Sequence, residues 1–438
     1  MTDTSFTYPT GPTFKADSIG KIFDVLWSGM SEKILTQTLL RESDKKWSIE
    51  DINAYLASVL VMGMTPEPSV EDYFCQDSQG IFGSKWMQET FTVHKWHEMN
   101  AHIHWDTDVC CDLLRSNCQQ AWDLRQVLIV DEMIRTFTGR WKWIQHVKGK
   151  PHDTGVKLYG VTDDSFYLWD FWVYKGSESE RTHTPTGIVV DFVKNAIQQQ
   201  YKPHIVVADS FYGSLQLAEE LHKMKIGCLL SCRSDRPSAI FTNTLHPLVS
   251  KKGDLASIHN SKFYAMTMYD KAKVNLISNI LNLNKTVSNL QRTKWLPLGI
   301  CWYRKWLGGL DHFDRWLHLY LTQHRNIKWT QALLSTLLKI TVNNTHIIAI
   351  YSDMDISYKD TVLKVIQHLK GSHTLRKDDK RPVYQLRKSE GNHFPEEMDT
   401  TKRCTHCLSK DIRSNTTYSC LVCKVPLHPK CFAPYHME

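Results

Sequence analysis

Residues 125–134 read RQVLIVDEMI, and residues 204–210 read HIVVADS. Each stretch is a short apolar run that ends in an acid, Asp131 in the first and Asp209 in the second. Short apolar runs rich in β-branched residues predict buried strands. Side chains at strand ends can converge at one edge of a sheet, where ligands and metals commonly bind. The two runs therefore predict a sheet with two carboxylates at its edge.

The surrounding segments predict a mixed sheet with helices. Residues 156–164 and 166–176 are rich in β-branched and aromatic residues, which favour strands. Residues 186–200 and 214–225 read as helices, the second with Ser214 as its N-cap. Three strands, a helix, a strand and another helix indicate an α/β unit with a mixed sheet.

The rest of the chain is read as further units around this one. The N-terminal segment has apolar residues at helical spacing and is expected to dimerise or to contact DNA, with a purely structural scaffold as the alternative. A segment inside the α/β unit breaks its order and contains two expected strands around a turn at 270–273. The expected segments are a helical domain (13–118), an α/β domain in two parts (119–235 and 301–355), a β-rich insertion (236–300), a basic linker (356–400) and a cysteine-rich domain (401–438).

Composition indicates a soluble globular protein of several units. The chain has 438 residues, of which 42% are hydrophobic and 23% charged, and its net charge is +7. The sequence has no run of 18 or more apolar residues, so no membrane partner is expected, and its polar N-terminus lacks a signal-peptide core. A reducing compartment is therefore expected. The basic excess favours a polyanionic partner without establishing one.

A cysteine-rich tail follows the basic segment. It reads Cys404-x2-Cys407-x12-Cys420-x2-Cys423-x4-His428-x2-Cys431-x4-His436. Two CxxC pairs at this spacing indicate structural Zn²⁺, which would also supply the folding energy of so short a segment. One arrangement is a cross-braced finger, with Cys404, Cys407, His428 and Cys431 on one ion and Cys420, Cys423 and His436 on a second. His406 or water would then complete the second site; a single site with four cysteine ligands is the alternative.

A third carboxylate, Asp311, opens an expected helix directly after Gly308 and Gly309. Phosphodiester chemistry with two divalent cations needs such a set of carboxylates, and hard oxygen ligands suit Mg²⁺ or Mn²⁺. Other acids lie nearby, and Asp314 is one helical turn after Asp311. These rivals are Glu132, Asp163, Asp164, Asp170 and Asp314.

Three blocks of sequence together resemble the piggyBac transposase family. The first is VLIVDEMIRTFTGRWKWIQHVKGKPHDTGVKLY (127–159), the second HIVVADSFYGSLQLAEEL (204–221) and the third WYRKWLGGLDHFD (302–314). The matching residues are Asp131, Glu132, Gly139, Arg140, Lys150, Pro151, Gly155 and Lys157 in the first block, and Tyr303, Lys305, Gly308, Gly309, Asp311 and Asp314 in the third. The tail is similar to the family's C-terminal domain at Cys431, Phe432, Tyr435 and His436. Departures at Thr138, Arg304, Trp306 and Leu307 leave the three aspartates intact.

The resemblance implies an α/β RNase H-like catalytic domain with Asp131, Asp209 and Asp311 as catalytic and metal-binding residues. It implies a DNA transposase that excises its element through hairpin ends, inserts at TTAA, and acts as a homodimer on double-stranded DNA with terminal inverted repeats; the expected location is the nucleus. Phosphate contacts are expected from basic residues near the blocks. These are Arg140, Lys148, Lys150, Lys157, Arg325 and Lys328.

Two other functions compete with an active transposase. A domesticated relative would bind DNA without cutting it, although the three retained aspartates disfavour this reading. A chromatin reader or ubiquitin-ligase module built on the zinc tail would leave the rest of the chain unexplained.

Overall fold

The computed structural model describes most of the chain, in two compact units, Met1–Leu375 and Arg376–Glu438. The described residues are 8–75, 83–137, 139–147, 154–176, 184–200, 202–234, 240–280, 286–289, 292–322, 328–375, 393–410 and 412–437.

The first unit begins with helices. They are α1 (Ile19–Leu26), α2 (Met30–Arg41), α3 (Ile49–Met64), α4 (Lys85–Thr90), α5 (Val93–His102) and α6 (Thr107–Gln120), with a 3-10 turn at Glu71–Phe74. A capping box starts α3: the Asp51 amide donates to Ser48 Oγ at 3.3 Å, and the Ser48 amide donates to Asp51 Oδ2 at 2.8 Å. A short pairing of β1 (Gly11–Pro12) with β2 (Trp122–Asp123) ties the start of the unit to the end of α6.

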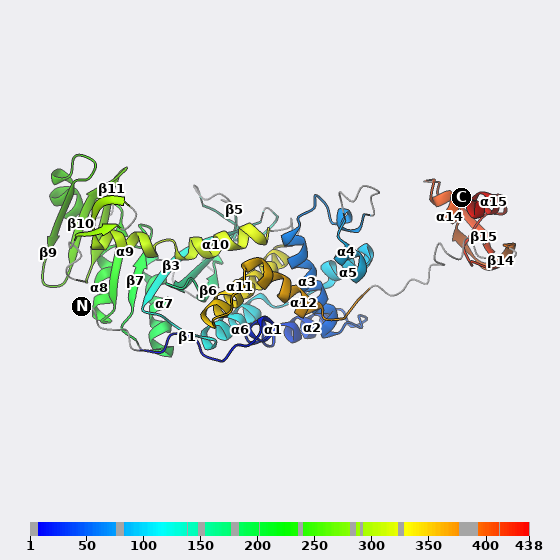
Figure 1. Cartoon of the computed structure of the whole chain (residues 1–438), viewed down its shortest axis with the longest axis horizontal. Coiled ribbons are helices and arrows are strands. Elements are labelled where there is room, and N and C mark those ends of the chain that lie inside the picture. The colour runs from blue at the N-terminus through cyan, green and yellow to red at the C-terminus, as the bar shows by residue number, and fades with distance from the viewer. Residues whose placement is uncertain are drawn as a thin grey trace. The chain divides into compact units, whose positions relative to one another are not determined.

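A mixed nine-stranded sheet forms the other part of this unit, which confirms the predicted combination of sheet and helices (Figure 1). Its strands are β3 (Val127–Thr136), β4 (Gln145–His146), β5 (Thr154–Asp163), β6 (Leu168–Val173), β7 (Ile205–Ala208), β8 (Gly227–Cys232), β9 (Leu255–His259), β10 (Tyr264–Tyr269) and β11 (Lys273–Ser278). The order is β4-β5-β3-β7-β8-β11-β10-β9, with β6 on β5. Strands β3, β7 and β8 are parallel, and the other pairs are antiparallel.

Helices cover both faces of this sheet. The two predicted helices after β6 and β7 are present as α7 (Pro185–Gln199) and α8 (Leu215–Lys223). Ser214 is the N-cap of α8, as predicted, and its hydroxyl accepts from the Leu217 amide at 3.1 Å. Leu128 and Val130 of β3 belong to the same buried cluster as apolar side chains of α7 and α8. Val127 and Ile129 point to the other face of the sheet. Their side chains pack with α9 (Leu298–Trp306).

The insertion expected over residues 236–300 does not stand apart from the sheet. Its strands β10 and β11 form the predicted hairpin, and β11 pairs antiparallel with β8 from Asn275↔Cys232 to Ser278↔Leu229. The open edge of β8 is thus paired by inserted strands, which satisfies its backbone groups. A second hairpin, β12 (Thr286–Asn289) with β13 (Arg292–Pro297), leads into α9.

Three more helices complete the first unit: α10 (Gly309–Tyr320), α11 (Trp329–Tyr351) and α12 (Tyr358–Lys370). The linker expected over residues 356–400 is therefore wrong for its first part, because α12 buries Val362, Val365 and Ile366. The apolar residues of α12 recur at helical spacing and so form one apolar face, which is buried in the fold. Helix α11 has the length and hydropathy of a membrane span, and 89% of its most apolar window is buried inside the fold.

Lys339 is an unusual residue of α11, since its side chain is buried and its ammonium donates to the Thr322 carbonyl at 3.2 Å. Burial lowers the pKa of Lys339 to about 7, and the positive charge of Arg135 acts in the same direction. In the unfolded chain the pKa of lysine is about 10.4. Between those values the unfolded state binds more protons, so the free energy of unfolding increases with pH.

We therefore expect Lys339→Met to stabilise the protein at pH 7 by on the order of 2 kcal/mol, because it removes a cation that is costly to bury. Its advantage over the wild type should shrink as pH rises from about 7 towards 10. Denaturant unfolding across this range measures both effects. Equal pH dependence in the two proteins would contradict the assignment.

The second unit is small. Its elements are β14 (Pro395–Arg403), α14 (Thr405–Leu408), β15 (Asn415–Cys420), a 3-10 turn at Pro429–Cys431 and α15 (Phe432–Met437). Strands β14 and β15 pair antiparallel. Its buried cluster consists largely of cysteines, with Val425, Leu427 and Phe432 as the larger apolar members. So small an apolar core needs another source of stability, such as bound metal.

Candidate functional site

Asp131 and Asp209 are brought together by the parallel pairing of β3 with β7. Val130 lies opposite Ala208 in this register, so the next residue in each segment is one of the two aspartates. Asp209 directly follows the end of β7, as expected, but the strand end expected at Asp131 is wrong, because β3 continues to Thr136 through its pairing with β5. Asp131 shares its parity with Val127 and Ile129, and Asp209 shares its parity with Val207. Alternation along a strand therefore directs both side chains towards the face that α9 covers. Asp131 is buried, and Asp209 is half-buried.

Helix α10 packs on β3 and β5 and brings Asp311 to the same region. A Cβ at Gly309 would lie 2.6 Å from Ile129 Cδ1 and 2.9 Å from Thr162 Oγ1, so a larger residue would have to displace these two side chains. The next residue, Leu310, packs over Gly160, which is the cross-strand partner of Asp131. Asp311 follows in the first turn and is exposed. The paired glycines thus fix the start of α10 beside the strand that carries Asp131.

Tyr303 of α9 is a member of this region that the sequence supplied only as part of a matching block. Burial raises the pKa of its hydroxyl above the usual range, and the negative charges of Asp209 and Asp131 act in the same direction, while a hydrogen bond with Ser231 opposes them. The buried hydroxyl of Tyr303 therefore lies within the electrostatic influence of both carboxylates. The arrangement concentrates negative potential on this face, where a cation would be stabilised.

Two local hydrogen bonds orient these aspartates. The Glu132 amide donates to Asp131 Oδ1 at 2.8 Å, and the Phe211 amide donates to Asp209 Oδ1 at 2.9 Å. A donor set made of carboxylate oxygens suits Mg²⁺ or Mn²⁺. Among the described residues, the groups of three or more side chains whose ligand atoms all lie within 4.8 Å of one another are two Cys/His groups of the second unit, and the three aspartates do not form such a group.

The rival carboxylates near the aspartates have structural partners. Glu132 has the opposite parity on β3 and accepts from the Tyr212 hydroxyl at 2.9 Å. Asp163 is fully buried and accepts from Trp122 Nε1 at 2.6 Å. Asp164 pairs with Arg125 at 2.9 Å. These three acids therefore hold the fold together.

The other two rivals are held by arginines. Asp170 is buried and pairs with Arg115 at 2.6 Å. Asp314 forms an ion pair with Arg135 of β3. All five rival acids thus have structural partners within the fold.

The predicted phosphate contacts divide into three groups. Lys148, Lys150 and Arg325 lie outside the described residues. Arg140 is exposed, whereas Lys328 is exposed but donates to the Ala101 carbonyl at 2.6 Å. Lys157 is only 8% exposed, and its ammonium lies over the rings of Tyr159 and Phe211. A surface contact between Lys157 and phosphate therefore does not match its place in β5, where strand alternation turns it inward.

The second unit contains two groups of metal-type ligands. The first consists of Cys404, Cys407, His428 and Cys431, as the cross-braced alternative expects. Cys407 Sγ lies 3.4 Å from His428 Nδ1 and 3.7 Å from Cys431 Sγ. Four converging sulfur and nitrogen donors are typical of a tetrahedral structural metal site.

The second group consists of His393, Cys420, Cys423 and His436. His393 Nδ1 lies 3.3 Å from Cys420 Sγ, and Cys423 Sγ lies 3.2 Å from His436 Nε2. His393 thus takes the place for which His406 or water was expected. His406 is buried but belongs to neither group. The ligands of the two groups alternate along the chain, which is the cross-braced order rather than a single four-cysteine site.

Two histidines in these groups have ring nitrogens fixed by backbone carbonyls. His428 Nε2 lies 2.9 Å from the Asn415 carbonyl, and His436 Nδ1 lies 2.8 Å from the Phe432 carbonyl. A carbonyl only accepts, so each of these nitrogens carries the proton. The other nitrogen, which faces the cysteines, is left as a lone-pair donor, as metal-bound histidines require.

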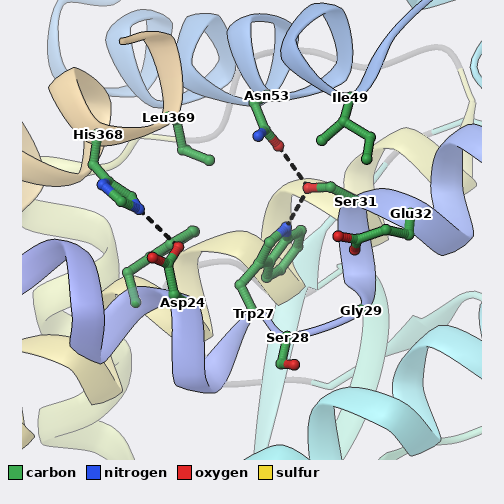
Figure 2. A pocket seen from close by; sticks show the side chains of 11 residues that line it. Asp24, Trp27, Ser28, Gly29, Ser31, Glu32, Ile49, Asn53, His368 and Leu369 are labelled. Carbon is green, nitrogen blue, oxygen red and sulfur yellow. Dashed lines mark hydrogen bonds and ion pairs between the residues drawn. The ribbon is translucent and has the colours of Figure 1, made fainter.

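A polar cavity of about 250 Å³ lies in the helical part of the first unit, between α1, α2, α3 and α12 (Figure 2). Its polar groups bind one another: His368 Nε2 is 2.7 Å from Asp24 Oδ1, and Ser31 Oγ donates to Asn53 Oδ1 at 2.6 Å while accepting from Trp27. No residue of β3, β7 or α10 lines it. The cavity is therefore separate from the aspartates.

Comparison with known sequences agrees with the resemblance of the three blocks. The family described as Transposase IS4 matches residues 21–346, which is most of the chain. The human PiggyBac transposable element-derived protein 3 is 22% identical over 335 residues, covering 70% of this chain and 55% of that protein. The human Chimeric ERCC6-PGBD3 protein is also 22% identical over 335 residues, which is 30% of its length. The chain thus spans about half of the first relative and less than a third of the second.

Comparison with solved structures identifies the fold. The piggyBac transposase, solved by cryo-EM in a synaptic complex with hairpin DNA, matches with a TM-score of 0.74 at 18% identity. The match covers 97% of this chain and 98% of that one. This match shows the shared fold. The family match, which covers most of the chain, shows that the chain belongs to the Transposase IS4 family, of the piggyBac type.

Proposed function

We propose that this protein is a DNA transposase that cuts and rejoins DNA with Asp131, Asp209 and Asp311 as its metal-binding carboxylates. The observation that supports the proposal is the register of β3 with β7, in which Asp131, in the middle of β3, and Asp209, directly after β7, follow the opposed residues Val130 and Ala208. The contact of Gly309 with Ile129, which starts α10 beside them, supports the choice of Asp311. Family membership supports the same chemistry.

The fold of the catalytic part is proposed to be RNase H-like. Three antiparallel strands, β6, β5 and β3, are followed by two parallel ones, β7 and β8, in adjacent positions. In this interpretation β9–β11 are an addition to that sheet, inserted before the segment that carries Asp311.

The three aspartates have different supports, which suits a rigid metal site. The middle of β3 holds Asp131, the residue after β7 is Asp209, and the first turn of a packed helix holds Asp311. Two bound Mg²⁺ or Mn²⁺ ions would supply Lewis acidity and activate a water or a 3′-hydroxyl. The chain's part is to hold the cations and, through exposed Arg140, to neutralise DNA phosphate.

The substrate is proposed to be double-stranded DNA with terminal inverted repeats, processed through hairpin ends and inserted at TTAA. The structural neighbour was solved with hairpin DNA, which supports this class of substrate. Cutting two ends together calls for a homodimer, and genomic DNA calls for a nuclear location. The second unit is proposed to bind two Zn²⁺ ions through its cross-braced ligands and to contact DNA or a protein partner.

A hairpin oligonucleotide with a TTAA tip tests the proposal. The full-length, zinc-loaded protein is expected to open the hairpin in Mg²⁺ and to stop when a chelator removes Mg²⁺ but leaves the zinc in place. Tight hairpin binding without opening in either Mg²⁺ or Mn²⁺ would contradict the proposal and favour a DNA-binding protein that no longer cuts.

A further inference from the structure

Arg135 is a buried cation in a strand that also carries a proposed catalytic aspartate. It lies on β3 four residues after Asp131, and its side chain is 4% exposed. Its guanidinium forms an ion pair with Asp314 of α10, whose side chain is 24% exposed. A buried arginine needs such a partner, because an unpaired charge in the interior is strongly unfavourable. Asp314 supplies that partner across the junction of the strand and the helix.

Along α10, the ion pair of Asp314 follows Asp311, and the contact of Gly309 precedes it. At the start of α10, Gly309 packs on Ile129 of β3. One turn later, Asp314 binds Arg135 of the same strand. Asp311 lies between these two anchors along the helix, as Asp131 lies between Ile129 and Arg135 along the strand.

Other contacts hold the same helical turn. Phe313 is buried, and its carbonyl accepts from Asn343 Nδ2 of α11 at 3.2 Å. Lys339, also on α11, feels the charge of Arg135. Asp314 is therefore part of a packed junction of β3, α10 and α11, in which it is the anion beside Arg135.

We propose that Arg135 and Asp314 are positioning residues: their ion pair locks the first turns of α10 onto β3 and so sets Asp311 relative to Asp131. Asp314 then acts through Arg135 and is not itself a metal ligand. This inference rests on the proposed function, because it assigns the geometry of that metal site. The inference gives Asp314, one helical turn after Asp311, a role different from that of Asp311.

Mn²⁺ binding to the full-length, zinc-loaded chain, followed by the EPR signal of free Mn²⁺, tests the inference without DNA or catalysis. Arg135→Gln and Asp314→Asn are each expected to raise the Mn²⁺ dissociation constant about 10-fold, the usual size of an outer-shell effect. The double variant should raise it no further, because either change already breaks the pair. Asp311→Asn should weaken binding far more. Arg125→Gln, which breaks the pair with Asp164, is the matched control and should leave binding unchanged.

The outcomes separate the inference from the proposed function. If a single variant does not fold, the double variant carries the test, because it leaves no unpaired buried charge. Unchanged Mn²⁺ affinity in the double variant would overturn the positioning role. Asp314→Asn as damaging as Asp311→Asn, with Arg135→Gln harmless, would make Asp314 a ligand and also overturn it. Failure of the wild type to bind Mn²⁺ in a manner that depends on Asp131 would instead overturn the proposed function.

Discussion

Asp131→Asn is expected to reduce DNA hairpin opening by about 10³-fold or more while leaving hairpin affinity within about a factor of three. The change keeps the size of the side chain, and its amide oxygen can still accept from the Glu132 amide. It removes the negative charge that would hold a divalent cation on the face shared with Asp209 and Tyr303. The loss should therefore fall on chemistry and not on DNA binding. Opening rates at saturating protein, together with binding measured by anisotropy, check both parts.

Asp164→Asn is the matched control for this prediction. Asp164 directly follows β5 on the neighbouring strand and is half-buried, and its partner is Arg125. It should retain nearly full opening activity. A tenfold or smaller loss in Asp131→Asn, or an equal loss in the control, would contradict the assignment of Asp131.

His393→Ala is expected to lower the zinc content of the full-length chain from two ions to one. His393 would be the fourth ligand of the group with Cys420, Cys423 and His436. The second unit has a small apolar core, so zinc binding supplies much of its folding free energy. Loss of one ion should therefore also unfold part of this unit. Metal analysis of the purified chain measures the stoichiometry, and Co²⁺ substitution reports whether the remaining site keeps three sulfur ligands.

His406→Ala is the control, because His406 lies between two cysteine ligands and yet belongs to neither group. It should keep two zinc ions. Retention of both ions in His393→Ala, or loss of one in His406→Ala, would show that the second site is completed differently.

Much of the sheet and of the site could be predicted because the signals are local. Apolar runs mark β3 and β7, although β3 continues beyond Asp131 to Thr136, and a serine three residues before its hydrogen-bond donor marks the starts of α3 and α8. The choice among acids was not local. Asp131 and Glu132 are adjacent in sequence, and only strand alternation and the Tyr212 contact separate them.

The remaining features depend on long-range pairing. His393 precedes the cysteine-rich stretch within a polar segment, so no spacing rule linked it to Cys420. The pairing of β11 with β8 and the ion pair of Arg135 with Asp314 both join segments far apart in the chain. Lys157 matched a family block, but its motif did not show that the side chain is buried against Tyr159 and Phe211.

The central claim is that the three aspartates hold the catalytic cation, and cleavage of the polypeptide by bound iron tests it most directly. Fe²⁺ that replaces Mg²⁺ in the zinc-loaded protein reduces added H₂O₂ to a hydroxyl radical and hydroxide, and added ascorbate returns the Fe³⁺ to Fe²⁺. The radicals cut the backbone close to the ion. The prediction is a set of cuts next to Asp131, Asp209 and Asp311 that excess Mg²⁺ suppresses and Asp131→Asn removes. Mg²⁺-sensitive cuts confined to other parts of the chain, or cuts unchanged in Asp131→Asn, would contradict it.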